Sequence, residues 1–181
     1  MTSRAAAVFP LFFFLLKVYQ YRMPADQAQI LWWCTISNLG LGLSMLLGFA
    51  RGVWIFSFML ILGTPIWLLD VWATGDFTIY SVFTHVISPA LGIYSVRKLS
   101  VPRGIWWQGM IYYFSLILIA RALTPPALNV NLAHDVYAAA KPFIQNYWLY
   151  TAMNSILLAT SLYVLGRLAS QRFPLARGPR T

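Results

Sequence analysis

Long apolar runs constrain the fold of this chain more than any other feature. Six such runs, separated by more polar connections, cover residues 5–21, 29–49, 53–72, 79–96, 104–122 and 147–168. Each approaches the roughly 20 residues that an α-helix needs to cross the hydrocarbon core of a bilayer. A helix also satisfies its own backbone hydrogen bonds, which a segment in lipid must do. The sequence therefore predicts an all-α, polytopic membrane helix bundle with six transmembrane helices.

The composition also indicates a membrane protein. Hydrophobic residues make up 60% of the 181 positions and charged residues only 9%, whereas soluble domains carry charge at about a quarter of their positions. The net charge of +9 does not indicate nucleic-acid binding, because the basic residues flank the apolar runs and line no polar face. We expect membrane lipids as partners and no nucleic acid, while association into a homo-oligomer stays open.

The charged residues divide unequally between the two ends of the predicted spans. One end would hold nine basic residues, namely Arg4, Arg51, Arg97, Lys98, Arg103, Arg167, Arg172, Arg177 and Arg180. The other end would hold four basic residues and all four acids: Lys17, Arg22, Arg121, Lys141, Asp26, Asp70, Asp76 and Asp135. Because Lys and Arg accumulate on the cytoplasmic side, the sequence predicts a multi-pass cell-membrane protein, in a bacterium the inner membrane, with both termini in the cytoplasm.

Residues 1–170 are predicted to form a single transmembrane domain, followed by a basic, disordered cytoplasmic tail over 171–181. The longest connection, 123–146, is either a lid or a surface linker. A short helix at the membrane interface is predicted within it over 135–143.

The first apolar run has two interpretations. Arg4 ahead of an apolar stretch, with small residues at Ala25 and Ala28, also resembles a cleavable signal peptide. If the run is retained as a first helix, Lys17 at its far end would extend to the interface and keep its ammonium in water.

A few polar side chains fall within the apolar runs. Cys34, His85 and Asn154 lie five to seven residues into runs that enter from the non-cytoplasmic end, roughly 8–10 Å deep at the helical rise of 1.5 Å per residue. Asp70 lies nearer the same end, and Asn38 follows Cys34 by one helical turn. Intramembrane polar residues are candidates for a functional site, so we expect these five side chains to gather inside the bundle.

Pro89 alters the helix that carries His85. Proline has no N–H to donate to the carbonyl four residues earlier, and that carbonyl belongs to His85. The sequence predicts a kink at the histidine and a free backbone acceptor there. Thr64-Pro65 predicts a similar disturbance in the run 53–72.

These residue types favour nucleophilic catalysis on a lipid ester. A buried thiol is inert without a base, and His85 could take the Cys34 proton. Asp70 or Asn154 could orient the imidazole, and Asn38 could donate to a developing oxyanion. The alternative is a non-catalytic transporter subunit, lipid-binding protein or assembly factor, in which these side chains only pack or bridge helices. No metal or organic cofactor is implied, because the other histidine lies in a loop.

Three short motifs carry a resemblance to a known family. Leu31-Trp32-Trp33-Cys34, Phe83-Thr84-His85-Val86-Ile87-Ser88-Pro89 and Asn146-Tyr147-Trp148 resemble the YwaF-type bacterial integral membrane proteins. These are similar to the transmembrane ether-phospholipid acyltransferases and the androgen-induced intramembrane lipid-ester hydrolases. The resemblance covers about residues 28–168. It implies an acyltransferase or hydrolase acting on lipid esters, with Cys34 as nucleophile and His85 as base.

Overall fold

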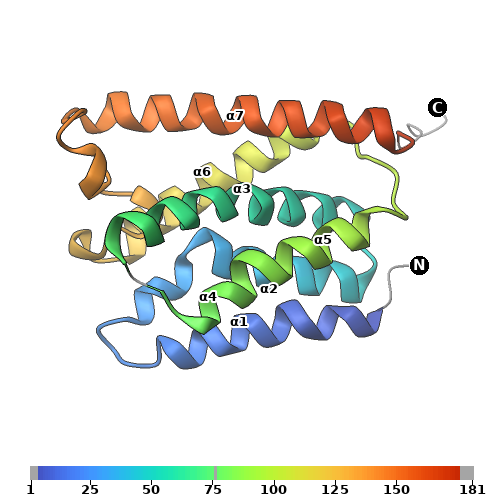
Figure 1. The fold of residues 1–181 in the computed structure, drawn as a ribbon, viewed down its shortest axis with the longest axis horizontal. Helices are drawn as coiled ribbons and strands as arrows, with labels where there is room; N and C mark the ends of the chain where they lie inside the picture. The colour runs from blue at the N-terminus through green and yellow to red at the C-terminus, as the bar shows by residue number, and fades with distance from the viewer. Residues whose placement is uncertain (1–3, 76, 176–181) are drawn as a thin grey trace.

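The computed structural model describes residues 4–75 and 77–175, which form an all-helical bundle (Figure 1). Helix makes up 78% of the structure, and the described residues contain no β-strand beyond an isolated bridge between Val101 and Leu175. The predicted all-α class is confirmed. Residues 176–181 of the predicted tail, with Arg177 and Arg180, lie outside the described residues, as does Asp76.

The chain passes along the bundle in alternating directions, and each predicted run falls on one pass (Figure 1). The passes are α1 (Val8–Gln20), α2 (Trp33–Leu47), α3 (Ala50–Thr74), α4 and α5 (Ile79–Val82 and Ser88–Val96, joined by a π-helical turn over Phe83–Ile87), α6 (Ile105–Leu123) and α7 (Tyr147–Arg172). Short 3₁₀ turns cover Arg4–Ala7, Gln27–Leu31, Pro126–Leu128, Val130–Leu132 and Ala138–Ala140. The first and last described residues lie at the same end of the bundle (Figure 1).

Three helical stretches are long and apolar enough to cross a membrane: Ala50–Thr74, Ile79–Val96 and Tyr147–Arg172. The helix α2 is apolar but has only 15 residues, and α1 has only 13. Three of the six predicted spans are therefore long and apolar enough to support the prediction of a membrane protein.

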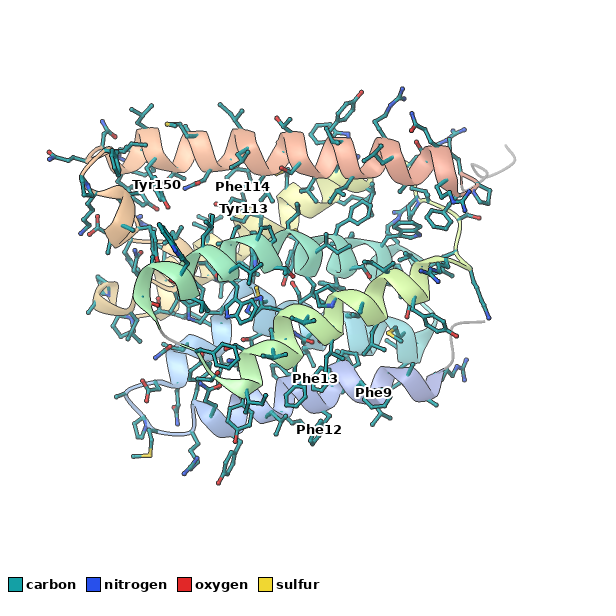
Figure 2. The ribbon with its side chains drawn as sticks, in the orientation of Figure 1. Phe9, Phe12, Phe13, Tyr113, Phe114 and Tyr150 are labelled. Carbon is teal, nitrogen blue, oxygen red and sulfur yellow. The ribbon has the colours of Figure 1, made fainter. Side chains whose placement is uncertain are left out.

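Large apolar side chains cover much of the outer surface of the bundle. On α1, Phe9 and Phe12 are exposed while Phe13 points inward and stacks on Phe83 at 5.2 Å between ring centroids (Figure 2). Other exposed apolar residues include Leu47, Trp72, Leu118, Ile156 and Leu157. So many exposed large apolar side chains are unfavourable in water and suit contact with lipid.

Glycines bring the helices into close contact. A Cβ added at Gly42 of α2 would lie 2.5 Å from Leu11 of α1, and one at Gly92 of α5 would lie 2.6 Å from Ser57 of α3. At Gly109 of α6 it would lie 2.9 Å from a methyl carbon of Leu162 on α7. Because lipid tails are as apolar as the side chains, helices in a bilayer associate through such close packing of small residues.

The connection after α6 is a packed cap over one end of the bundle. Val130, Ala133 and Val136 within it are almost completely buried, so the surface-linker interpretation is wrong for these residues. The predicted helix over 135–143 is also wrong: this stretch holds only the 3₁₀ turn Ala138–Ala140. The connection is held in place by buried contacts with several helices. It does not need the regular backbone hydrogen bonds of a longer helix.

Candidate functional site

Cys34 lies in the first turn of α2 and faces α3. A Cβ added at Gly63 would meet the Cys34 Sγ at 2.7 Å and the Trp33 Nε1 at 2.8 Å. The sulfur and the indole therefore occupy the space that any other residue at position 63 would need. Cys34 is buried, so the thiol is enclosed by these side chains, and a substrate reaches it only when they move.

His85 lies in the π-helical turn between α4 and α5. Its carbonyl accepts a hydrogen bond from the Thr64 Oγ1 of α3 at 2.6 Å, so the acceptor that Pro89 was predicted to free is present and is used to join two helices. The predicted distortion takes the form of a π turn, which is common at functional sites. The His85 ring stacks on the Trp67 ring, with centroids 4.9 Å apart and planes at 3°.

One nitrogen of the His85 ring stands out chemically. Nδ1 is buried and has no hydrogen-bond partner among the residues that the structure describes. Buried polar atoms are almost always paired, so an unpaired one calls for an explanation. An unpaired imidazole nitrogen can take a hydrogen-bond partner, such as a substrate, a water molecule or a side chain.

The same side of α3 holds both residues in place. Gly63, which touches Cys34, and Trp67, which stacks on His85, are four residues apart and so lie one above the other on one helix face. Thr64 lies between them in the sequence and bonds the His85 carbonyl. Cys34 and His85 therefore both pack against one turn of α3, and their direct association stays a prediction.

Asn38 links the cysteine helix to the histidine helix. Its Nδ2 donates to the Cys34 carbonyl at 2.8 Å, and its Oδ1 accepts from the Ser88 hydroxyl, three residues after His85. Both Asn38 and Ser88 are fully buried. With its amide used in this way, Asn38 acts as a bridge that fixes the spacing of the helices.

Lys17 is a member of the site that the sequence did not reveal. The prediction that it extends to the interface is wrong, because Lys17 is only 6% exposed. Its Nζ donates to Gln20 at 3.0 Å and to Ser81 at 3.5 Å, and it has no acidic partner among the described residues. Ser81 lies four residues before His85 on the same helical pass, so Lys17 packs against the helix that carries the histidine. A buried cation here favours an anion, such as a thiolate or an oxyanion, beside it.

Asp70 and Asn154 make no hydrogen bond to the side chain of Cys34 or His85 among the described residues. The Asp70 Oδ1 accepts from the Tyr137 hydroxyl at 2.6 Å, which ties α3 to the cap, and this bond raises the pKa of Tyr137 to about 12. Asn154 lies on α7, which contacts mainly α6. Figure 2 shows Tyr113 and Tyr150 in the space between α6 and α7. Neither Asp70 nor Asn154 hydrogen-bonds the His85 ring among the described residues.

The cap contributes one residue that sequence reasoning missed. Asn131 Oδ1 accepts from the Trp33 N–H at 2.7 Å, and its Nδ2 donates to the Leu31 carbonyl at 2.8 Å. It therefore caps the first turn of α2 from 98 residues away in the sequence. Its backbone has φ of +56°, a left-handed conformation that asparagine tolerates better than most residues. In the sequence, the only hint of this capping role was the pair of asparagines, Asn129 and Asn131, in a loop.

Replacing Asn131 by alanine should destabilise the fold and loosen the start of α2. Two lost hydrogen bonds cost about 1 kcal/mol each, and alanine in a left-handed conformation adds about 1 kcal/mol. Asn131→Gly removes the same two bonds without the backbone strain, so it should cost less than alanine. Thermal unfolding of the purified protein measures both effects. Unfolding of both variants at the wild-type temperature would contradict the role given to Asn131.

Comparisons with models of protein families, with curated proteins and with solved structures found no match for this chain. No group of three or more His, Cys, Asp or Glu side chains that could hold a metal ion occurs in the described part of the chain. A fold by itself does not determine a function. The chemistry of the Cys34 and His85 region is therefore the basis on which a function is assigned.

Proposed function

We propose that all six helical passes cross the membrane with the termini in the cytoplasm. The charge distribution supports this orientation, because the passes alternate in direction and the described basic residues separate into seven at one end and four at the other. Loops rich in Lys and Arg stay in the cytoplasm. The π-helical turn and the 3₁₀ turn before α2 extend two of the passes, and tilt or local thinning of the bilayer accommodates shorter helices.

The orientation can be tested with single cysteines in a Cys34→Ala background. Ser100 lies at the basic end and Phe143 in the cap, and both are exposed. A membrane-impermeant maleimide added to intact cells should label Phe143→Cys and leave Ser100→Cys unlabelled until the membrane is permeabilised. The reverse pattern would overturn the orientation, and labelling of both sites in intact cells would overturn the even number of crossings.

We propose further that the protein is an intramembrane acyltransferase or hydrolase that acts on lipid esters. The observation that carries this function is the unpaired, buried Nδ1 of His85, held against the turn of α3 that also packs against the Cys34 sulfur. A thiol, a base and the Lys17 cation in one region are the components of an activated nucleophile. The resemblance to YwaF-type proteins assigns the same two residues.

The proposed reaction proceeds in two steps. The Cys34 thiol gives its proton to the His85 imidazole, and the thiolate attacks the ester carbonyl carbon. The carbon–oxygen bond to the lipid alcohol then breaks, and that alcohol takes the proton from the imidazolium, leaving a thioester on Cys34. Water or an acceptor hydroxyl next attacks the thioester with His85 as base, giving a fatty acid or a new ester and restoring the thiol. Lys17 stabilises negative charge during both attacks.

The alternative is a non-catalytic lipid-binding or assembly protein. The tight packing of Gly63 and Trp33 around the Cys34 sulfur favours it, since a small buried thiol also serves as a packing residue. In that case Asn38, Thr64 and Ser88 have only the structural task of bridging helices.

A turnover assay separates these functions. The purified full chain is placed in nanodiscs of defined diacyl and ether phospholipids, with and without a lysophospholipid acceptor, and the lipids are followed by mass spectrometry. The enzyme proposal predicts a new free fatty acid or a new acylated acceptor that the Cys34→Ala protein does not form. Product formation at the same rate by both proteins would contradict it.

A further inference from the structure

A cleft lies between the ends of α5 and α7. These two helix ends lie at the end of the bundle opposite the start of α2 (Figure 1). It has a volume of about 570 Å³ and is lined by Ile93, Arg97, Arg172 and Phe173. Arg97 directly follows the last residue of α5, and Arg172 is the last residue of α7. Two guanidinium groups from separate helices therefore border one hollow.

The walls of this cleft are held by specific contacts. The Phe173 ring packs edge-on against Trp54 at 5.7 Å between centroids, and the Trp54 Nε1 donates to the Ser100 carbonyl at 3.0 Å. The Val101 N–H donates to the Pro174 carbonyl at 2.9 Å. The segment after α7 is thus tied to α3 and to the connection between α5 and α6, so the cleft is a built part of the bundle.

The positive charge of the cleft is not neutralised by the protein. Arg97 and Arg172 are exposed and make no hydrogen bond or ion pair with any residue that the structure describes. The one ion pair among those residues joins Lys141 to Asp135 at the opposite end, where it lowers the pKa of Asp135. The described acids all lie at that opposite end: Asp26, Asp70 and Asp135.

The two arginines do not serve to bind the free carbonyl groups at the ends of their helices. Cations near the last turn of a helix are attracted by its free carbonyls, but neither guanidinium donates to a backbone carbonyl in the described part of the chain. Each arginine also has an exposed apolar residue one turn before it on the same helix face, Ile93 before Arg97 and Leu168 before Arg172. The surface is therefore cationic at the end of the bundle and apolar directly beneath.

We propose that this cleft binds the headgroup of an anionic phospholipid. The two guanidinium groups would hold the phosphate, for which Arg geometry is well suited, and the acyl chains would lie along Ile93 and Leu168. A free phosphate ion would use the arginines alone and leave the apolar surface below without a role. The site does not require Cys34, so its occupancy is independent of the proposed reaction.

Native mass spectrometry of the full chain in detergent can test this site. The protein is titrated with phosphatidylglycerol, with phosphatidylcholine of the same acyl chains, and with inorganic phosphate. At about 1 kcal/mol for each basic residue near an anionic lipid, Arg97→Gln or Arg172→Gln should weaken phosphatidylglycerol binding about fivefold, and the double variant about thirtyfold. Phosphatidylcholine binding should be weaker and insensitive to these changes.

The matched control is the double variant Arg51→Gln with Arg103→Gln. It removes the same charge from exposed positions at the same end of the bundle, outside the cleft. Wild-type binding by this control supports a defined site. An equal loss in both double variants would show general electrostatic attraction and overturn the site. Equal binding of both phospholipids, or inorganic phosphate competing as strongly as the lipid, would overturn the assignment to an anionic headgroup.

Discussion

Cys34→Ala should abolish turnover of lipid esters. Cys34 is the only cysteine in the chain, so no second thiol can form the acyl intermediate. Loss of the nucleophile in a covalent mechanism costs at least about a thousandfold in rate, because an uncatalysed attack by water must then replace it. The assay is lipid turnover in nanodiscs, with the rate of the variant compared with that of protein-free discs.

A control must show that the loss arises from chemistry and not from packing. Ser57→Ala removes a small buried polar group from α3, where the Ser57 hydroxyl donates only to the Val53 carbonyl of its own helix. This variant should retain turnover, and Cys34→Ala should unfold near the wild-type temperature. Cys34→Ser, which keeps the shape but replaces the thiol by a much weaker acid, should be nearly inactive. Full turnover by Cys34→Ala would exclude Cys34 as the nucleophile.

His85→Ala should lower turnover by about a hundredfold to ten-thousandfold, the range for loss of a general base. Its ring nitrogen Nδ1 is the unpaired group proposed to take the thiol proton. The same change should slow alkylation of Cys34 by a chloroacetamide probe at neutral pH, because less thiolate forms without a base. Since Cys34 is the single cysteine, the increase in intact mass reports this one site.

The chain offers a matched control for the histidine. His134 is the other histidine and lies in the cap, 3.4 Å from the Thr124 hydroxyl. His134→Ala should leave both turnover and Cys34 alkylation unchanged. A purely structural role for His85 would instead give a variant that unfolds at lower temperature and whose Cys34 reacts faster because the packing has loosened. Slower alkylation with unchanged unfolding therefore separates a base from a packing residue.

Local sequence patterns predicted the features that depend on neighbours in the chain. The apolar runs predicted the helices, since length and hydrophobicity are local properties. Pro89 predicted the free carbonyl of His85, because proline removes a donor at a fixed spacing. The interval between Cys34 and Asn38 placed both on one face of α2, where Asn38 now bonds the Cys34 carbonyl.

Features that depend on distant segments were missed. Lys17 was expected in water because a lysine near a span end usually extends outward, but Ser81 of α4 and Gln20 bind its ammonium inside the bundle. Asp70 was expected to orient the histidine, but its carboxylate accepts a hydrogen bond from the Tyr137 hydroxyl of the cap. Asn131 caps a helix that begins far earlier in the chain. No local pattern encodes such pairs, because they depend on how the helices and the cap pack together.

The central claim is that the Cys34 sulfur carries an acyl group during turnover, and intact-mass measurement tests it most directly. The wild-type protein is mixed briefly with a diacyl phospholipid and quenched in acid. We expect a mass increase equal to one acyl chain, located on Cys34 by fragmentation, removed by neutral hydroxylamine and absent in Cys34→Ala. Turnover that proceeds with no acyl group on Cys34 at any time point would contradict the account.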